Sequence, residues 1–531
     1  MKGAHMALPA NNTQWPPTAW ATPLADMRRW EAWWTGDPQK LAKAYADNTE
    51  TGFEDVIGTR ANGKLVRRWF HGRKTNTNAP ASSRHDLHVP IASDLCATSA
   101  DLLYSQPPTI QTGHETTDQR ISEYLTNGLA DTLLEGAETG AALGGRYMRV
   151  TWDPTISAMP FLTTVDADHT IPVFRWGKLV AVTFWTTLET DSTTVWRHFE
   201  HHELDPNGRG IVSHALYSGT ATSVGISRPL TEHPATVGLA NSVDDHQQAT
   251  EGITPGLLVA YIPNITPQRR WRHIPQARML GRSDLDGQEP LMDALDEVYT
   301  SWMRDIRLGK ARILADANML EQTSDGQTVF NLDREVFTPL EGLAGTMRDT
   351  VPIQAQQFAI RVAEHQQTAT DLIHRIIRGA RYSTSTFGDV QDSDITATEV
   401  KAREKTTMTT RDRKIRIETT ALQQLVSKML TIDQTVFNTP GLQTGDVKVT
   451  FPDMEDASPS DLANTAATMR SAQLLSLQTG VEMIHPDWDT TQVADEVQRL
   501  LDAQPLASPD QWQPGKVTDD GENEEEDTTN K

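Results

Sequence analysis

Three polar residues in a strand-like stretch have the types and spacing of a small metal site. His198, Glu200 and His202 occupy alternate positions, and alternate residues of a β-strand share one face. Two imidazoles and a carboxylate on one face could bind a metal ion and activate water, as in a metal-dependent hydrolase. The sequence has no HExxH helical spacing and no second histidine cluster. A solvated strand edge is therefore the competing interpretation.

Other signatures of catalysis are missing from the sequence. There is no GxxxxGK[ST] phosphate loop, no GxGxxG after a strand and no GxSxG elbow, so we expect neither an ATPase nor a nucleotide cofactor. The single cysteine, Cys96, lies among small and apolar residues. A buried, inert thiol is the expected reading of such a residue. We expect no enzyme activity and no cofactor.

Basic residues gather at the end of a predicted long helix, in an otherwise acidic chain of net charge -23. They are Arg304, Arg307, Lys310 and Arg312. A second basic group, Lys401 to Arg416, lies on another long helix and alternates with acidic residues. An ordinary salt-bridged helix surface explains this pattern. Contact with a phosphate backbone, or with acidic faces of neighbouring subunits, is the functional alternative.

Composition sets the class of protein. The chain has 531 residues, of which 37% are hydrophobic, enough for several domains. The like-charge segment at 519–527 predicts a disordered acidic tail over 506–531. No stretch has the roughly 18 apolar residues that a membrane helix needs. One cysteine and no signal pattern favour a reducing compartment, so we expect synthesis in the cytosol and no membrane association.

Periodicity predicts an α+β protein. Helices are expected at 19–47, 92–105 and 118–138, and the tryptophans of the first are expected in a core stripe. Residues 147–261 alternate as antiparallel strands. Long helices follow at 290–313, 353–378 and 395–432, and a last helical module at 456–505. At about 1.5 Å per residue, the first two long helices would each run roughly 35 Å. Helices of this length need packing partners, which points to neighbouring subunits.

Three stretches resemble the portal proteins of tailed double-stranded DNA bacteriophages, especially long-tailed phages of Gram-positive hosts. The first runs from His88 to Pro108 and is similar to the family's "P-I-A-x-D … A-x-x-S-A-x-L-L-F-x-E-P-P" segment, from which Cys96, Tyr104 and Gln106 depart. The second is Gly281-Arg282-Ser283-Asp284 with the helix start at 291–297, and the third is 395–400. Their order and spacing carry the resemblance.

This resemblance implies a portal-type fold with a wing, a two-helix stem, a small α/β clip, a tunnel loop and a helical crown. The implied boundaries are 1–287 for the wing, with strands over about 147–261, 288–312 for stem helix 1, 313–352 for the clip, 353–378 for stem helix 2, 379–394 for the tunnel loop, 395–455 for a long helix returning to the wing, and 456–505 for the crown.

The resemblance also implies partners and a place of action. Such a subunit forms a homo-oligomer, a dodecameric ring at one capsid vertex of the virion, through which double-stranded DNA is packaged and ejected. The expected partners are the terminase large subunit, a head-tail adaptor, the major capsid protein and a scaffold. The channel candidates are Arg304, Arg307, Lys310, Arg312, Tyr382, Ser383, Thr384, Phe387 and Asp389. Another virion structural protein, such as an adaptor, is the alternative, although adaptors are usually much shorter.

Overall fold

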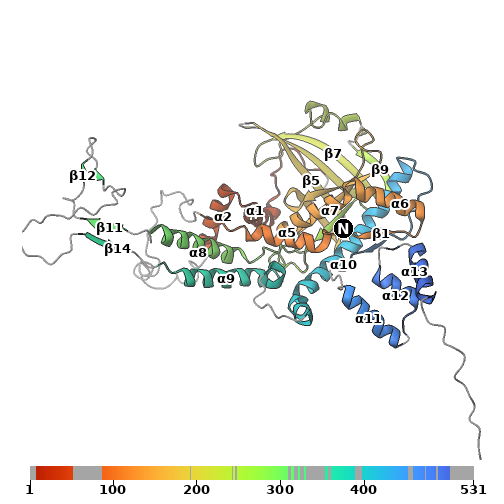
Figure 1. Cartoon of the computed structure of the whole chain (residues 1–531). Coiled ribbons are helices and arrows are strands. Elements are labelled where there is room, and N and C mark those ends of the chain that lie inside the picture. Colours follow the sequence, from red (N-terminus) through yellow and green to blue (C-terminus); the bar gives the residue numbers. More distant parts are fainter. Residues whose placement is uncertain are drawn as a thin grey trace, which may run out of the picture. The chain divides into compact units, whose positions relative to one another are not determined.

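The computed structural model divides the chain into two compact units, residues 1–452 and 453–531 (Figure 1). It describes residues 8–51, 87–191, 193–241, 243–244, 248–308, 312–315, 321–322, 328–329, 353–356, 360–388, 397–452, 459–472, 474–485, 488 and 490–502. The candidate sites Lys310 and Asp389 and the acidic tail lie outside these residues. Each unit is described by itself.

The first unit opens with helices that pack on one another. Gly36 has φ +65° and caps α1, and Pro38 begins the next helix, so the single helix expected over 19–47 is two. A left-handed cap followed by proline cannot continue a helix. Trp30 and Trp33 are buried, which confirms the core stripe. The helices are η1 (Thr18–Trp20), α1 (Ala21–Thr35), α2 (Pro38–Thr51), α5 (Ile91–Tyr104), α6 (Glu115–Tyr124), η3 (Leu125–Leu129) and α7 (Ala130–Leu143).

The strand-rich region is antiparallel, as the sequence predicts. One sheet has the order β10-β2-β3, and a larger sheet has the order β4-β5-β6-β7-β8 with β9 also paired to β7. Two-residue periodicity and β-branched residues such as those of β5 favour this pairing. Figure 1 shows β5, β7 and β9 within the larger sheet. The strands are β2 (Gly145–Thr151), β3 (Phe161–Asp166), β4 (Thr170–Arg175), β5 (Lys178–Thr190), β6 (Val195–Leu204), β7 (Arg209–Gly219), β8 (Ile226–Arg228), β9 (Gln248–Pro255) and β10 (Val259–Pro263). The short 3-10 turns between and after them are η4 (Ala167–His169), η5 (Leu230–Glu232) and η6 (Leu239–Asn241).

Three long helices follow, with boundaries that correct the expected ones. The first is α8 (Glu289–Leu308), the second is α9 (Val362–Gly379) and the third is α10 (Ala397–Thr435). The expected extension of the first to 313 and the expected start of the second at 353 are wrong. The reason is that β11 (Arg312–Ala315) and β14 (Ile353–Gln356) pair antiparallel with each other. Backbone hydrogen bonds between these segments replace the helical ones that periodicity suggested.

Short strand pairs complete the first unit. Besides β11 and β14, the region expected as a clip contains β12 (Glu321–Gln322) paired with β13 (Thr328–Val329). Farther along the chain, β1 (Thr109–Gln111) pairs with β15 (Lys448–Thr450). This last pair joins the segment after α5 to the segment after α10.

Buried apolar residues form two clusters in the first unit. One contains the tryptophans of α1, the larger sheet, the start of α8 and the end of α9. The other contains α5, α7, β2, β10 and the second half of α10, including Leu422, Leu425 and Val426. Because α10 crosses the second cluster, its charged residues must find partners inside the fold.

The second unit is helical in its described part. It contains α11 (Pro459–Ser471), α12 (Leu477–Ile484) and α13 (Thr490–Asp502), as expected for 456–505. The Ser476 side chain caps α12 by accepting a hydrogen bond from the Thr479 backbone N–H. None of the described helices in either unit is long and apolar enough to cross a membrane.

Candidate functional site

The paired helices α8 and α9 lie side by side (Figure 1), and one acidic residue ties them together. The Asp305 carboxylate accepts a hydrogen bond from Arg361 across 3.1 Å and is hydrogen-bonded to His365 Nε2 at 2.9 Å. The Trp302 ring stacks on the His365 ring with centroids 6.0 Å apart. The hydrogen bonds from His365 and then from Arg361 lower the pKa of Asp305. The pair is therefore joined by polar contacts as well as apolar packing.

The start of α8 is fixed by buried carboxylates. Glu289 accepts a hydrogen bond from Trp30 Nε1 at 3.0 Å and another from Arg270 at 2.9 Å. Two turns further on in the chain direction, Asp296 accepts from the Tyr45 hydroxyl at 2.6 Å. Both carboxylates are almost fully buried, at 2% and 1% exposed. Because buried charges need partners, these contacts set the direction in which α8 leaves the N-terminal helices.

Two of the predicted channel residues, Arg304 and Arg307, are exposed on α8. Arg312, predicted with them on one helix, is instead in strand β11, and Lys310 lies outside the described residues. The basic residues of α10 behave differently from a surface stripe. Arg411 donates to the Leu102 carbonyl at 2.7 Å, and Lys414 is buried. The burial of these two side chains fits neither the expected salt-bridged helix surface nor the alternative of contact with a phosphate backbone.

The segment that follows α9 turns back against α10. Its 3-10 helix η8 (Thr384–Phe387) is held by Thr407, whose hydroxyl accepts from the Ser383 backbone N–H at 2.8 Å and is hydrogen-bonded to Thr386 at 2.9 Å. Ser383, Thr384 and Phe387 are partly exposed. Together these contacts give the first half of the expected tunnel loop a defined conformation.

Tyr382 is not placed where a DNA-contacting side chain would be. It is 2% exposed, and its hydroxyl donates to Asp284 at 2.9 Å. Lys414 donates to the same carboxylate at 2.8 Å and to Ser99 at 2.5 Å. The resemblance implied that Tyr382 faces the channel, but the ring fills an apolar site and the hydroxyl satisfies a buried charge. The prediction that Tyr382 contacts DNA does not fit this burial.

Glu200 and His202 lie on one strand face, as a metal site there would require. The side chain of Arg149 already neutralises the carboxylate on that face. Glu200 is hydrogen-bonded to His202 at 2.6 Å and forms an ion pair with Arg149 of β2. His198 is hydrogen-bonded to His214 at 3.2 Å rather than directed at Glu200. Burial opposes ionisation of Glu200, but Arg149 and then His202 outweigh it and hold its pKa well below the usual range. Because the carboxylate is already neutralised, this face does not resemble a metal site.

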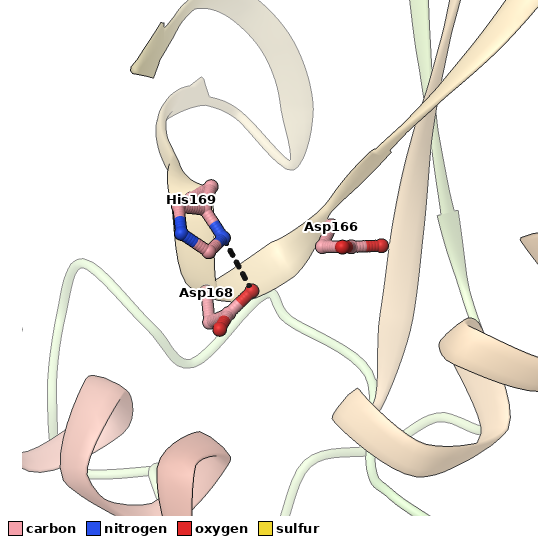
Figure 2. Close-up of side chains that lie close together, drawn as sticks. All are labelled: Asp166, Asp168 and His169. Atoms are coloured by element: carbon pink, nitrogen blue, oxygen red, sulfur yellow. Dashed lines mark hydrogen bonds and ion pairs between the residues drawn. The ribbon is translucent and has the colours of Figure 1, made fainter. Parts of the chain in front are cut away.

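A second group of possible metal ligands lies at the end of β3 and in η4 (Figure 2). Ligand atoms of Asp166, Asp168 and His169 lie within 4.8 Å of one another. His169 Nδ1 is, however, hydrogen-bonded to Asp168 at 3.0 Å, and Figure 2 shows the Asp166 carboxylate directed away from that pair. The side chains do not converge on one point, so they do not form a prepared cation site. Among the described residues, no other group of at least three possible ligands meets this spacing.

Cys96 is 0% exposed, and burial raises its pKa. This confirms the inert thiol expected from the sequence, because the thiolate is the reactive form. Sequence reasoning named Asp284 only within the second resembling stretch and Lys414 only within a basic group, and it did not single out Asp305. Their sequence neighbours are largely polar, so no local pattern marks these three residues as the ones that join the segments.

The family model described as "Phage portal protein, SPP1 Gp6-like" matches residues 59–506. No curated protein matches the chain. A chain of the neck of an empty GTA particle computed with C6 symmetry is similar at 11% identity and a TM-score of 0.34, over 79% of this chain and 92% of that chain. A chain of the virion of a native gene transfer agent particle is similar at 12% identity and a TM-score of 0.36, over 83% of this chain and 98% of that chain.

Proposed function

We infer, because this chain belongs to the SPP1 Gp6-like family of phage portal proteins, that it is the subunit of a ring at one capsid vertex of a virion. The ring would be a homo-oligomer, with twelve copies as the expected number. The observation that carries this inference is the family match, which extends from residue 59 to residue 506. The match includes α8, α9 and α10, so the elements described above are part of what the family shares.

The proposed architecture assigns each part of the chain a place in such a ring. Residues 1–287 would form the wing, α8 and α9 the stem, and the strand pairs between them the clip. The segment from Gly379 to Asp394 would be the tunnel loop, α10 would return to the wing, and the helices of 456–505 would form the crown. With the bounds of α8 and α9, the proposed stem would comprise 289–308 and 362–379.

The proposed working role is a passive conduit for genome DNA during packaging and ejection. A net charge of -23 would repel phosphates in general, so DNA could pass without adhering. The exposed pair Arg304 and Arg307 would offset this repulsion at one level of the stem. The clip side would dock the terminase large subunit during packaging and the head-tail adaptor afterwards. The wing would contact the major capsid protein and a scaffold, and assembly would occur in the host cytoplasm.

The long helices support a ring because they have surface left to bury. The α8–α9 pair keeps Ile306 and Val362 at 38% and 46% exposed, and a ring of identical subunits needs one interface whose rotation closes. Helices that pack side by side around an axis supply such an interface.

The decisive experiment is electron microscopy and native mass measurement of the purified full chain over a range of concentrations. The expected result is a ring of about twelve subunits with a central hole. A population that stays monomeric or dimeric at every concentration, including in the presence of capsid protein and scaffold, would overturn the proposal.

A further inference from the structure

A polar cavity lies where the turn after β9 meets one face of α10. Its volume is about 350 Å³, and its lining is Thr254, Pro255, Gly256, Gln424, Ser427, Lys428 and Thr431. Gly256 has φ +77°, and a Cβ added there would lie 3.7 Å from Lys428 Nζ. The turn therefore brings bare backbone close to the ammonium group. Hydroxyl, amide and ammonium groups thus surround a space large enough for a small ion or one side chain.

Lys428 is a partly buried cation without a charged partner among the residues that the structure describes. Its Nζ donates to the Leu257 carbonyl oxygen, and an ammonium group has further N–H donors to place. Burial alone lowers the pKa of Lys428 to about 8. A buried cation that is not neutralised by a carboxylate is costly, so an anion in the cavity would stabilise it.

Thr254 supplies an independent observation that points to a ligand. Its side chain is 1% exposed, and Oγ1 has no hydrogen-bond partner within the described part of the chain. A buried hydroxyl without a partner costs about 1 to 3 kcal/mol. A hydroxyl can donate to an anion, and Thr254 lines the same cavity as Lys428. The Lys428 ammonium and the Thr254 hydroxyl are therefore both available to donate to a single bound anion.

We propose that this cavity is a binding site for a single carboxylate group, which accepts hydrogen bonds from Lys428 Nζ and Thr254 Oγ1. One positive charge lines the cavity, so an anion with one negative charge is balanced and a doubly charged phosphate is not. The carboxylate can come from a free small acid or from an Asp or Glu side chain of a second copy of this chain, which carries 71 acidic residues against 48 basic ones.

The test follows the reactivity of Lys428 in the full-length protein. An amine-reactive acylating reagent modifies only neutral amines, and peptide mass spectrometry reads each lysine separately. The rate at Lys428 is measured against pH in sodium chloride and in sodium acetate of equal ionic strength. A bound carboxylate raises the pKa of the ammonium. One unit of increase slows acylation at neutral pH roughly tenfold. The exposed Lys405 on the same helix is the internal control and should not change.

Two substitutions of Thr254 distinguish a loss of carboxylate binding from a general change in the fold. Thr254→Val should weaken the effect of acetate on the acylation of Lys428, whereas Thr254→Ser should retain this effect. Raising the protein concentration without acetate tests the second source. If the pH midpoint of Lys428 acylation rises with protein concentration, the ligand is a carboxylate of another copy of the chain. Covering Lys428 with an uncharged surface of that copy would not raise the midpoint.

Two outcomes would overturn the proposal. One is that neither acetate nor a higher protein concentration changes the pH midpoint of Lys428 acylation. The other is that phosphate raises this midpoint more than acetate does. The acetate measurement does not depend on ring formation, so its failure would leave the proposed function unaffected.

Discussion

Lys414 of α10 donates to Asp284 across 2.8 Å, and the two side chains are 4% and 0% exposed. This ion pair joins the turn before α8 to the middle of α10, and the Tyr382 hydroxyl donates to the same carboxylate. Three segments that are distant in the chain thus meet at one buried charge. The first two predictions concern this meeting point.

Replacing Lys414 with Met should destabilise the first unit by about 3 to 5 kcal/mol, because it leaves the Asp284 carboxylate buried without its cation. Urea unfolding followed by tryptophan fluorescence measures the loss. Arg416→Met, at an exposed position of the same helix, is the matched control and should change stability by no more than about 0.5 kcal/mol. Equal stability of the two variants would contradict the role assigned to the pair.

Tyr382→Phe should cost about 2 kcal/mol, since one hydrogen bond to a buried carboxylate is lost while the ring still fills its site. Rings that assemble from this variant should package DNA at the normal rate, because the side chain is buried. A packaging defect at unchanged stability would instead place Tyr382 in contact with DNA.

Stability should fall as the pH drops from about 6.5 to about 4, because burial lowers the pKa of His198 from 6.5 to about 4. The unfolded chain takes up a proton in this window and the folded chain does not, which costs up to about 3 kcal/mol below it. His214, Glu200 and Arg149 face His198. His198→Gln should flatten the pH dependence of the urea midpoint. His114→Gln, at an exposed site, should leave it unchanged. A pH profile that His198→Gln does not alter would disprove this assignment.

Trp176→Asn should stabilise the β4–β5 hairpin by roughly 1 kcal/mol. Trp176 has φ +53° in the two-residue turn and is 96% exposed, whereas Asn before Gly is the favoured pair in such turns. Thermal unfolding measures the gain. Trp176→Val is the opposite control, since a β-branched residue is strained at positive φ. A loss of stability in Trp176→Asn would mean that the indole makes contacts which its exposure does not reveal.

Reversing charge at Arg304 and Arg307 together should leave ring formation intact and change the salt dependence of DNA packaging, because both side chains are exposed on α8. Packaging is measured as DNA protected from nuclease at several salt concentrations. Reversal of Arg470 and Arg499, exposed in the second unit, gives the same change in net charge and serves as the control. If DNA packaging depends on salt in the same way in both double variants, the proposal that Arg304 and Arg307 offset the repulsion of DNA in the stem is contradicted.

The sequence predicted elements better than contacts. Alternation along β6 correctly placed Glu200 and His202 on one face, because strand periodicity is a local property. It could not reveal Arg149, which lies 51 residues away in the chain and on another sheet. That single cation changes the chemistry of the face from a possible metal site to an internal ion pair.

The same limit explains the segment after α9. The family resemblance implied a tunnel loop over 379–394, and within its described part Ser383, Thr384 and Phe387 are partly exposed. The burial of Tyr382 depends on Asp284, 98 residues earlier, which no local pattern can indicate. Likewise, the helical stripe of 353–378 begins with residues whose strand partner lies about forty positions earlier, at Arg312–Ala315. Pairing over such separations is decided by the tertiary structure.

Buried charges occur at intervals along α10, and together they act on its mechanics. Lys414 meets Asp284, Glu418 binds Arg146 through both oxygens, and Asp433 binds Arg120. A slide of the helix along its own axis by one turn, about 5.4 Å, would unpair all three at once. Under a force along its axis, α10 should therefore move as one rigid helix, because all three pairs must break together. A force applied at one end of the helix should be transmitted to the other end.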